Sequence, residues 1–370
     1  MKRDLLSFAD LTRADADRLF ATAARLKSDL RAGRRHLELA GRTLALIFHK
    51  PSLRTRVSFE VAMTQLGGSS IFITDREIGM GSREPVQDVA RVLSGYVDGI
   101  MIRTFDHQIA VNLAKHASVP VVNGLTDWLH PCQILADMLT MIEHGLDLDR
   151  AVVAYVGDGN NVANSWIEAA GLYGLTLRIA CPEGYDPDMA LVAQVRTAGK
   201  GRVEIVRTPD EAADGADVLY TDVWASMGQE AEREKRLPVF RPYQINGALL
   251  DRAKPNALVL HCLPAHRGEE ITDEVMEGPN SGVFPQAENR LHVQKAVLYE
   301  LLVAGAAGRR SGAVRAASTR KPAARRKAAG KPAARKPATR KPAARKPAAR
   351  KPAARKPAGR KKAARKRPRR

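Results

Sequence analysis

The sequence predicts an α/β fold made of two doubly wound parallel-sheet domains followed by a disordered basic tail. Short apolar runs alternate with helix-like segments over most of the first 308 residues, a rhythm typical of parallel sheets with helices on both faces. One long helical segment, Pro131–His144, divides these runs into two sets. The segment from Arg309 to the end carries only basic charges. We therefore expect two domains, a helix between them and a tail outside both.

Nine apolar runs are expected to form strands, four before the long helical segment and five after it. In chain order they are Thr43–Phe48, Ser70–Ile73, Gly99–Arg103, Val119–Val122, Ala151–Val156, Thr176–Cys181, Arg202–Val206, Val218–Thr221 and Ala257–His261. Helices are expected at 52–66, Pro85–Tyr96, His107–His116, Pro131–His144 and Val162–Tyr173. Two units of about 130–150 residues fit an ordinary domain size. We expect a first domain over residues 1–140, a second over 141–288, and a last helix at about 289–308 that returns to the first.

The charge is unevenly distributed along the chain. Of 60 Lys and Arg residues, 27 lie in residues 309–370, which leaves 33 basic against 40 acidic residues, a net charge of −7, in the body. Cys132, Cys181 and Cys262 are few, odd in number and far apart, which favours a reducing compartment over a disulfide framework. The charged N-terminus does not resemble a signal peptide, and there is no apolar run of about 18 residues. We expect a cytoplasmic protein without a membrane partner.

The tail repeats Lys-Pro-Ala-Ala-Arg, with slight variation, from Lys321 onward. Prolines at positions 332, 337, 342, 347, 352 and 357 block a continuous helix, and self-repulsion keeps the chain extended. The repeat resembles the basic tails of linker histones and of some bacterial nucleoid proteins. Its charge favours non-specific, salt-dependent binding of residues 309–370 to nucleic acid or another polyanion, and thus association with the nucleoid. A solubilising extension without a partner is the alternative.

The segment Ser52-Leu53-Arg54-Thr55-Arg56 follows a strand and opens a helix. Backbone N–H groups, the helix dipole and two guanidinium groups all favour a phosphate at such a position. A Ser N-cap followed by solvated arginines is an equally good interpretation of this segment alone.

Polar groups follow the strands of both predicted sheets. In open α/β sheets the ligand lies beyond the carboxyl ends of the strands, so these groups predict a site in a cleft between the two domains. They are Arg103, Asn123-Gly124-Leu125-Thr126-Asp127, His130-Pro131-Cys132-Gln133, Gly157-Asp158-Gly159-Asn160-Asn161, Asp222, Ser226-Met227-Gly228, His261-Cys262-Leu263-Pro264 and His266-Arg267-Gly268.

Several of these groups have simpler interpretations. His130 before a proline can be a helix-start residue, and Cys262 at a strand end can be a small buried hydrophobe. A dinucleotide fingerprint at Gly157 lacks its third glycine, because Val162 stands in that place. The spacing of His261, Cys262 and His266 matches no paired zinc-ligand pattern. We therefore expect neither a metal nor an organic cofactor.

Taken together, five ordered motifs resemble the aspartate/ornithine carbamoyltransferase family, and within it the ornithine-type members. The resemblance covers residues 1 to about 308. The motifs are Ser-Leu-Arg-Thr-Arg at 52–56, His-Pro-Cys-Gln at 130–133, Asp222 with Ser-Met-Gly at 226–228, His-Cys-Leu-Pro at 261–264 and Glu-Asn-Arg at 288–290, which is expected just before the last helix. The first two motifs are shared by the wider family, whereas Ser-Met-Gly and His-Cys-Leu-Pro are typical of the ornithine type.

The resemblance implies a role for each matching residue. Catalysis would involve Arg54, Arg103, His130 and Cys262. Carbamoyl phosphate would be bound by Ser52, Leu53, Arg54, Thr55, Arg103, His130, Gln133, Cys262, Leu263 and Arg290. Ornithine would be bound by Asn161, Asp222, Ser226 and Met227. Leu53 departs from the family pattern, which more often has Thr there. Phosphate affinity would fall only if the hydroxyl, and not the backbone N–H, does the binding.

The implied reaction joins carbamoyl phosphate and L-ornithine to give L-citrulline and phosphate. The implied assembly is a homotrimer or a multiple of trimers, in which the loop Gly81-Ser82-Arg83-Glu84 reaches the active site of a neighbouring subunit. Two alternatives remain: a carbamoyltransferase for putrescine or N-acetylornithine, and a nucleoid-associated DNA-binding protein whose enzyme-like body is a scaffold. Asp222 favours free ornithine over the related amines, because an α-ammonium needs a carboxylate partner. The direction of the reaction in the cell stays open.

Overall fold

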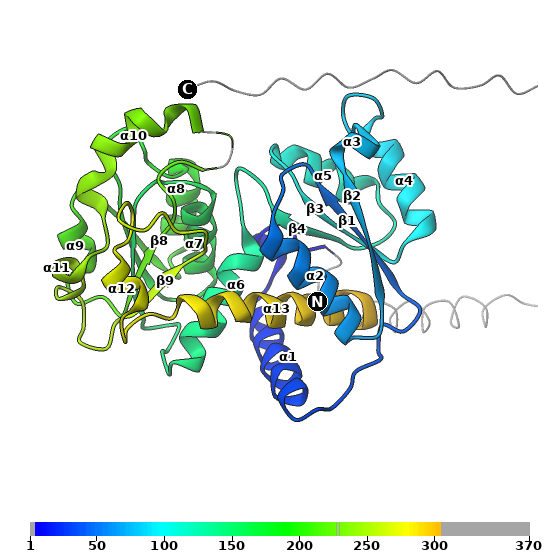
Figure 1. Ribbon diagram of the computed structural model, residues 1–370, viewed down its shortest axis with the longest axis horizontal. Helices are drawn as coiled ribbons and strands as arrows, with labels where there is room; N and C mark the ends of the chain where they lie inside the picture. The colour runs from blue at the N-terminus through cyan, green and yellow to red at the C-terminus, as the bar shows by residue number, and fades with distance from the viewer. Residues whose placement is uncertain (1–3, 227, 229, 305–370) are drawn as a thin grey trace, which may run out of the picture. The chain divides into compact units, whose positions relative to one another are not determined.

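The first parallel sheet has the strand order β2-β1-β3-β4 and forms one lobe of the protein (Figure 1). The computed structural model describes residues 4–226, 228 and 230–304. The strands of this sheet are β1 (Thr43–Phe48), β2 (Ser69–Thr74), β3 (Gly99–Arg103) and β4 (Val121–Leu125). Its register pairs Phe48 with both Thr74 and Arg103, so the ends of β1, β2 and β3 lie level with one another.

The second sheet, also parallel, has the strand order β7-β6-β5-β8-β9 and forms the other lobe. Its strands are β5 (Val152–Val156), β6 (Thr176–Ala180), β7 (Arg202–Val206), β8 (Val218–Thr221) and β9 (Leu258–His261). Nine predicted strands are therefore present, and the predicted fold class of two doubly wound parallel-sheet domains is confirmed.

Helices pack against both sheets. The longer ones are α1 (Arg13–Arg31), α2 (Leu53–Gln65), α4 (Val86–Tyr96), α5 (His107–His116), α6 (Pro131–Glu143), α7 (Asn161–Leu172), α8 (Met189–Ala198), α10 (Arg233–Phe240) and α13 (Val283–Tyr299). The shorter ones are α3 (Asp75–Ile78), α9 (Pro209–Ala213), α11 (Gly247–Leu250) and α12 (Asp273–Glu277), with single 3-10 turns at 8–10, 230–232 and 241–243 and a π turn at 300–304.

The strand orders fix where a ligand can lie. The order reverses between β1 and β3 in the first sheet and between β5 and β8 in the second. A crevice opens at such a switch point because the helices that follow the two strands leave on opposite faces of the sheet. The segments that begin at His49, Thr104, Gly157 and Asp222 leave these four strands, and they carry most of the predicted site.

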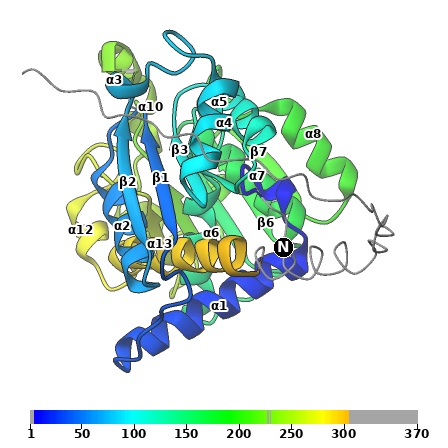
Figure 2. The ribbon, with the colours of Figure 1, turned by 90° about the vertical axis from the view of Figure 1, so that its right-hand side faces the viewer.

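Two helices join the lobes into one core. α6 is buried over nearly its whole length, from Pro131 to Met141. α13 packs on α1, α2 and α6 and also touches β9, and Figures 1 and 2 both place it beside α1 and α6. One cluster of buried apolar side chains therefore runs from Phe59 on α2 through Met138 on α6 to Tyr155 on β5.

Two predicted elements differ from the structure. The fourth strand, expected at Val119–Val122, is β4 at Val121–Leu125, because Pro120 has no N–H for the ladder while Leu125 pairs with Arg103 across a register shift. The last helix, expected to begin at about 289, begins at Val283, so the Glu-Asn-Arg motif lies within it. Pro285 lies in the first turn of this helix, where a proline is tolerated.

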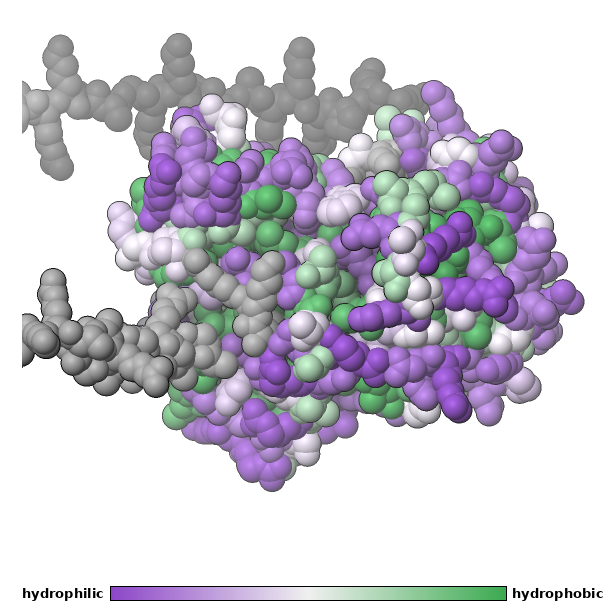
Figure 3. All heavy atoms as spheres, turned by 180° about the vertical axis from the view of Figure 1, so that it is seen from behind, coloured by the Kyte–Doolittle hydropathy of each residue, from purple (hydrophilic) through white to green (hydrophobic). Residues whose placement is uncertain are grey.

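The face of the protein drawn in Figure 3 is mainly polar. Figure 3 shows the face opposite to Figure 1, where hydrophilic residues predominate and hydrophobic ones form smaller areas between them. Over the described ranges, no helix combines the length and the apolar character that crossing a bilayer requires. The predicted disordered tail, 309–370, lies outside the described residues.

Candidate functional site

A cavity of about 700 Å³ lies at the carboxyl ends of both sheets. Its lining comes from the segments after β1, β3, β5, β8 and β9, together with the starts of α2, α6 and α7. Eleven of the predicted site residues line it: Ser52, Leu53, Arg54, Arg103, His130, Asn161, Asp222, Ser226, Cys262, Leu263 and Arg290. The structure thus gathers groups that are up to 238 positions apart in the sequence, since Ser52 and Arg290 share one cavity.

The N-terminus of α2 opens into this cavity, and both interpretations of the Ser52 segment hold. Ser52 is the N-cap, because its Oγ accepts a hydrogen bond from the Thr55 N–H at 3.3 Å. It also lines the cavity together with Leu53 and Arg54. Leu53 is 76% exposed and also lines the cavity, so it lies at the open edge of the site.

Three guanidinium groups make one side of the cavity strongly positive. Burial and the nearby charges of Arg290 and Arg54 lower the pKa of Arg103 to about 9. Burial also lowers the pKa of Arg290, and the charge of Arg54 adds to this effect. The lowered pKa values mean that these buried guanidinium charges repel one another, which makes the electrostatic potential of this side of the cavity strongly positive. An anionic ligand would relieve this repulsion.

Thr55 and Gln133 lie directly behind these arginines. Arg290 donates from Nη2 to Thr55 Oγ1 and from Nη1 to Gln133 Oε1, both at 3.0 Å. Arg103 Nη1 lies 3.5 Å from the same Thr55 oxygen. Both Thr55 and Gln133 are buried. These neutral side chains hold the guanidinium groups in place.

His130 is a neutral side chain in this environment. Burial first, and then the charges of Arg290 and Arg103, lower its pKa well below the usual value. Its backbone N–H donates to Ser165 Oγ at 2.7 Å, which fixes the start of α6 against α7. His130 can therefore offer a neutral ring N–H to a carbonyl oxygen, while the positive charge at this point comes from the arginines.

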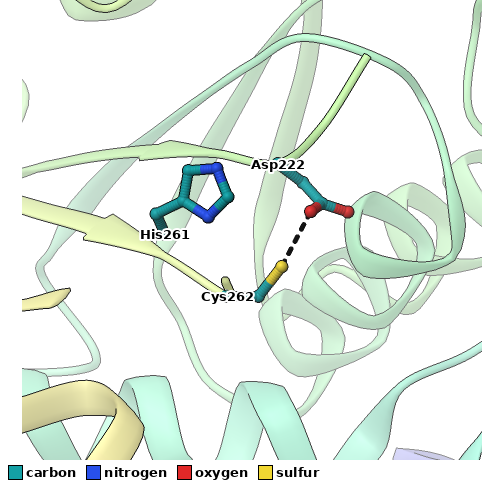
Figure 4. Close-up of side chains that lie close together, drawn as sticks. All are labelled: Asp222, His261 and Cys262. Carbon is teal, nitrogen blue, oxygen red and sulfur yellow. Dashed lines mark hydrogen bonds between the residues drawn. The ribbon is translucent and has the colours of Figure 1, made fainter. Parts of the chain in front are cut away.

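The side of the cavity formed by the second sheet is acidic. Asp222 follows β8 and accepts a hydrogen bond from Cys262 Sγ at 2.7 Å (Figure 4). It also accepts one from Asn160 Nδ2 at 2.8 Å. Both donors are neutral, so the charge of Asp222 has no cationic hydrogen-bond partner among the described residues. An ammonium group is the natural complement to such a carboxylate.

Cys262 keeps its proton here. Burial raises its pKa well above the usual value, and the negative charge of Asp222 raises it further. A thiolate is the form that attacks electrophiles, so the thiol acts as a hydrogen-bond donor and not as a nucleophile. Leu263 next to it has a left-handed φ of 60°, a costly conformation for a branched residue, and its N–H donates to His261 Nδ1 at 2.9 Å.

Three further residues are predicted to bind ornithine: Asn161, Ser226 and Met227. Asn161 lines the cavity, but its Nδ2 donates to the carbonyl of Thr126 at 2.7 Å. The preceding Asn160 is the one that reaches Asp222. Ser226 lines the cavity, and Met227 lies outside the described residues.

Sequence reasoning missed several lining residues. Lys50, which pairs with Asp127, lies just before the recognised motif and could have been found from its position at the end of β1. Three others come from loops and from α10, where no local pattern marks them: Tyr185, Asp186 and Arg236. Arg236 donates from Nη1 to Asp158 at 2.9 Å, so that carboxylate, unlike Asp222, has a cationic partner.

Comparisons with known proteins agree on one family. Family models match residues 3–143 as the "aspartate/ornithine carbamoyltransferase, carbamoyl-P binding domain" and residues 149–301 as the "Asp/Orn binding domain". The chain is 55% identical over 303 residues to an ornithine carbamoyltransferase of Syntrophus aciditrophicus, covering 82% of this chain and 100% of that protein. It is 52% identical over 304 residues to that of Chlorobaculum tepidum, covering 81% of this chain and 90% of that protein.

Solved structures give the same result. The ornithine carbamoyltransferase from Pyrococcus furiosus matches with a TM-score of 0.78 at 49% identity, over 81% of this chain and 97% of that one. The enzyme from Burkholderia thailandensis matches with a TM-score of 0.75 at 41% identity, over 81% of this chain and 99% of that one. Since both family models and these relatives together span nearly all of the described residues, the chain belongs to the aspartate/ornithine carbamoyltransferase family.

Proposed function

We propose that this protein transfers the carbamoyl group of carbamoyl phosphate to the δ-amine of L-ornithine, giving L-citrulline and phosphate. The observation that carries the proposal is the division of one cavity into a side with three guanidinium groups and a side with an unneutralised carboxylate. An acyl phosphate fits the first side, and an amino acid with a free α-ammonium fits the second.

The first side can hold the carbamoyl phosphate. Arg54 and the backbone at the start of α2 would bind the phosphate, which leaves in the reaction. Arg103, Thr55 and a neutral His130 would face the carbonyl oxygen, where negative charge develops during attack. Gln133 would bind the carbamoyl amide, and Arg290, Cys262 and Leu263 would complete the enclosure.

The second side orients the amine. Asp222, together with Asn161, Ser226 and Met227, would hold the α-amino acid end of ornithine so that the δ-nitrogen points towards the carbonyl carbon. The δ-nitrogen must lose its proton before it attacks, and a free amine of this type has a pKa of about 10.4. The positive potential of the guanidinium groups would lower that pKa as the amine approaches.

This proposal assigns a role to each lobe. Residues 1–140 with the returning last helix would bind carbamoyl phosphate, and residues 141–288 would bind ornithine. The packing of α13 on α1 and α2 supports the return of that helix to the first lobe. The reaction itself needs no electron transfer, and proton transfer and charge stabilisation suffice for it.

Citrulline formation tests the proposed function directly. Carbamoyl phosphate is offered with L-ornithine, N-acetylornithine or putrescine, using the full chain and a chain that ends at Gly308. We expect ornithine to be preferred over N-acetylornithine by at least about tenfold, since acetylation removes the ammonium that would pair with Asp222. Putrescine keeps an ammonium at that end, so its rate tests whether the site also requires the α-carboxylate. Faster carbamoylation of putrescine or N-acetylornithine would show that this amine, and not ornithine, is the substrate. A lack of activity with all three amines would contradict the proposed carbamoyltransferase function.

We also propose a homotrimer as the working assembly. The side chains of Gly81-Ser82-Arg83-Glu84 do not line the cavity of their own chain, and three of these four residues are exposed. They are therefore available to a neighbouring subunit. A solution mass of three chains, about 120 kDa given a chain of 40.3 kDa, is expected from light scattering.

For the basic tail we propose polyanion binding. Residues 309–370 contain 27 basic and no acidic residues, whereas residues 1–308 carry a net charge of −7. Attraction to a polyanion would therefore come from the tail alone. We predict that the full chain is retained with duplex DNA on a filter at low salt and is released as salt rises, whereas the chain ending at Gly308 is not retained at any salt concentration. Equal retention of both chains would contradict this prediction.

A further inference from the structure

Asp137 is a fully buried carboxylate one helical turn after Gln133 on α6. Its Oδ1 accepts two hydrogen bonds at 2.7 Å, one from Gln133 Nε2 and one from Gln286 Nε2 on α13. It does not line the cavity, so it can affect the reaction only through these neighbours.

The hydrogen bonds decide how the Gln133 amide is oriented. An oxygen that already accepts from Gln286 requires a donor from Gln133, so the NH₂ group of Gln133 must face Asp137. The other end, Gln133 Oε1, then faces Arg290 Nη1 at 3.0 Å. The reversed amide would place oxygen against oxygen at Asp137 and NH₂ against a guanidinium at Arg290, losing both hydrogen bonds.

The same carboxylate also reaches the second sheet. Gln286 Oε1 accepts a hydrogen bond from the backbone N–H of His261 at 2.9 Å, at the end of β9 and just before Cys262. Asp137 therefore connects the side chain on the carbamoyl side to the strand end that completes the cavity.

Protonation does not change this orientation. Burial raises the pKa of Asp137 to about 7, although hydrogen bonds from Gln286 and Gln133 oppose the effect. Since Oδ1 accepts from both amides, a proton bound at neutral pH resides on Oδ2. In either state Oδ1 remains an acceptor for Gln133.

We propose that Asp137 is a positioning residue that keeps the Gln133 oxygen on the side of Arg290, which lines the cavity, and so makes the site prefer an acyl phosphate with an NH₂ group over one with a methyl group. An oxygen in that place accepts a hydrogen bond from a carbamoyl NH₂, and it has nothing to accept from an acetyl group. This inference rests on the proposed function, because it assumes that the acyl group lies beside Gln133.

The test compares carbamoyl phosphate with acetyl phosphate. Asp137→Leu removes the acceptor with little change of size, and Asp137→Asn keeps an acceptor oxygen for both glutamines. For the Leu variant we expect the KM for carbamoyl phosphate to rise about tenfold or more, while the Ki of acetyl phosphate as a competitor stays within about twofold. The Asn variant should keep both constants within about threefold of the parent protein.

Two further variants separate positioning from general disturbance. Thr140→Val alters another buried hydrogen-bonding side chain of α6 and should leave the ratio of the two constants unchanged. Asp137→Ser is used if the Leu variant does not fold, with the same expected change in the ratio. A Leu or Ser variant that weakens both ligands equally, or an Asn variant as impaired as Leu, would overturn the inference. An inactive parent protein would instead reject the proposed function.

Discussion

Replacing Arg103 with glutamine is expected to lower kcat about 10²–10³-fold and, at the same time, to raise the melting temperature of the unliganded protein. The loss of activity follows from the position of Arg103 at the end of β3, inside the cavity and next to Thr55. There its charge would stabilise the oxygen that becomes negative during attack, and glutamine keeps a polar group without that charge.

The gain in stability follows from the sign of the pKa shift. The pKa of Arg103 falls from its ordinary value to about 9 in the folded protein, because burial and the charges of Arg290 and Arg54 disfavour the charged form. Below pH 9 the group is charged in both the folded and the unfolded protein, so folding bears the full cost of burying that charge. This cost declines only as the pH rises above 9 towards the ordinary pKa of an arginine. Removing the charge removes the cost, as expected where a site is built for function at the expense of stability.

A matched arginine gives the control. Arg13 is partly exposed and pairs with Asp149 at 2.7 Å, and this hydrogen bond raises its pKa. Arg13→Gln should therefore leave kcat unchanged and leave the melting temperature unchanged or slightly lower. Thermal unfolding and steady-state kinetics on both variants are the measurements. A lower melting temperature for the Arg103 variant would mean that its charge is neutralised in the folded protein, which contradicts the electrostatic picture of the cavity.

The fold was predictable because its local signals agree with one another. Each of the nine strands has an apolar run of its own. Polar or proline residues mark where the helices between them begin, as at Ser52 and Pro131. The prediction was wrong where pairing with a neighbouring strand, and not the local apolar run, determined the bounds of a strand. Asn123 shows this, because its predicted loop is part of β4 and its side chain donates to the Leu6 carbonyl instead of facing the cavity.

The site was predictable only for residues that belong to a motif. Arg54 and Cys262 were found because their segments follow strands, and parallel strands end at one edge of the sheet. Arg236 and Tyr185 reach the cavity from α10 and from the loop after β6, and only tertiary packing brings them there. The neutral state of His130 also depends on distant residues, since two arginines from other elements help to determine it.

Replacing Asp222 with asparagine is expected to raise the KM for ornithine about 100-fold, while the affinity for carbamoyl phosphate changes by less than about threefold. The carboxylate has only neutral hydrogen-bond partners, Cys262 and Asn160, so its charge is available to the α-ammonium of the substrate. Asparagine has nearly the same shape but no charge, and its NH₂ group would face a thiol or amide donor. The guanidinium side of the cavity lies on the other lobe and is not altered.

Asp158 provides the comparison for this prediction, because it is a carboxylate in the same cavity that already has a cation. Arg236 donates to it at 2.9 Å, so Asp158→Asn should raise the KM for ornithine much less than Asp222→Asn does. Ornithine saturation curves and carbamoyl phosphate binding by calorimetry on both variants give the four numbers needed. If the two variants were equally impaired, the total negative charge of the cavity, and not the unpaired state of Asp222, would attract the amine. If Asp222→Asn weakened both substrates alike, the carboxylate would be holding the cavity together instead of binding ornithine.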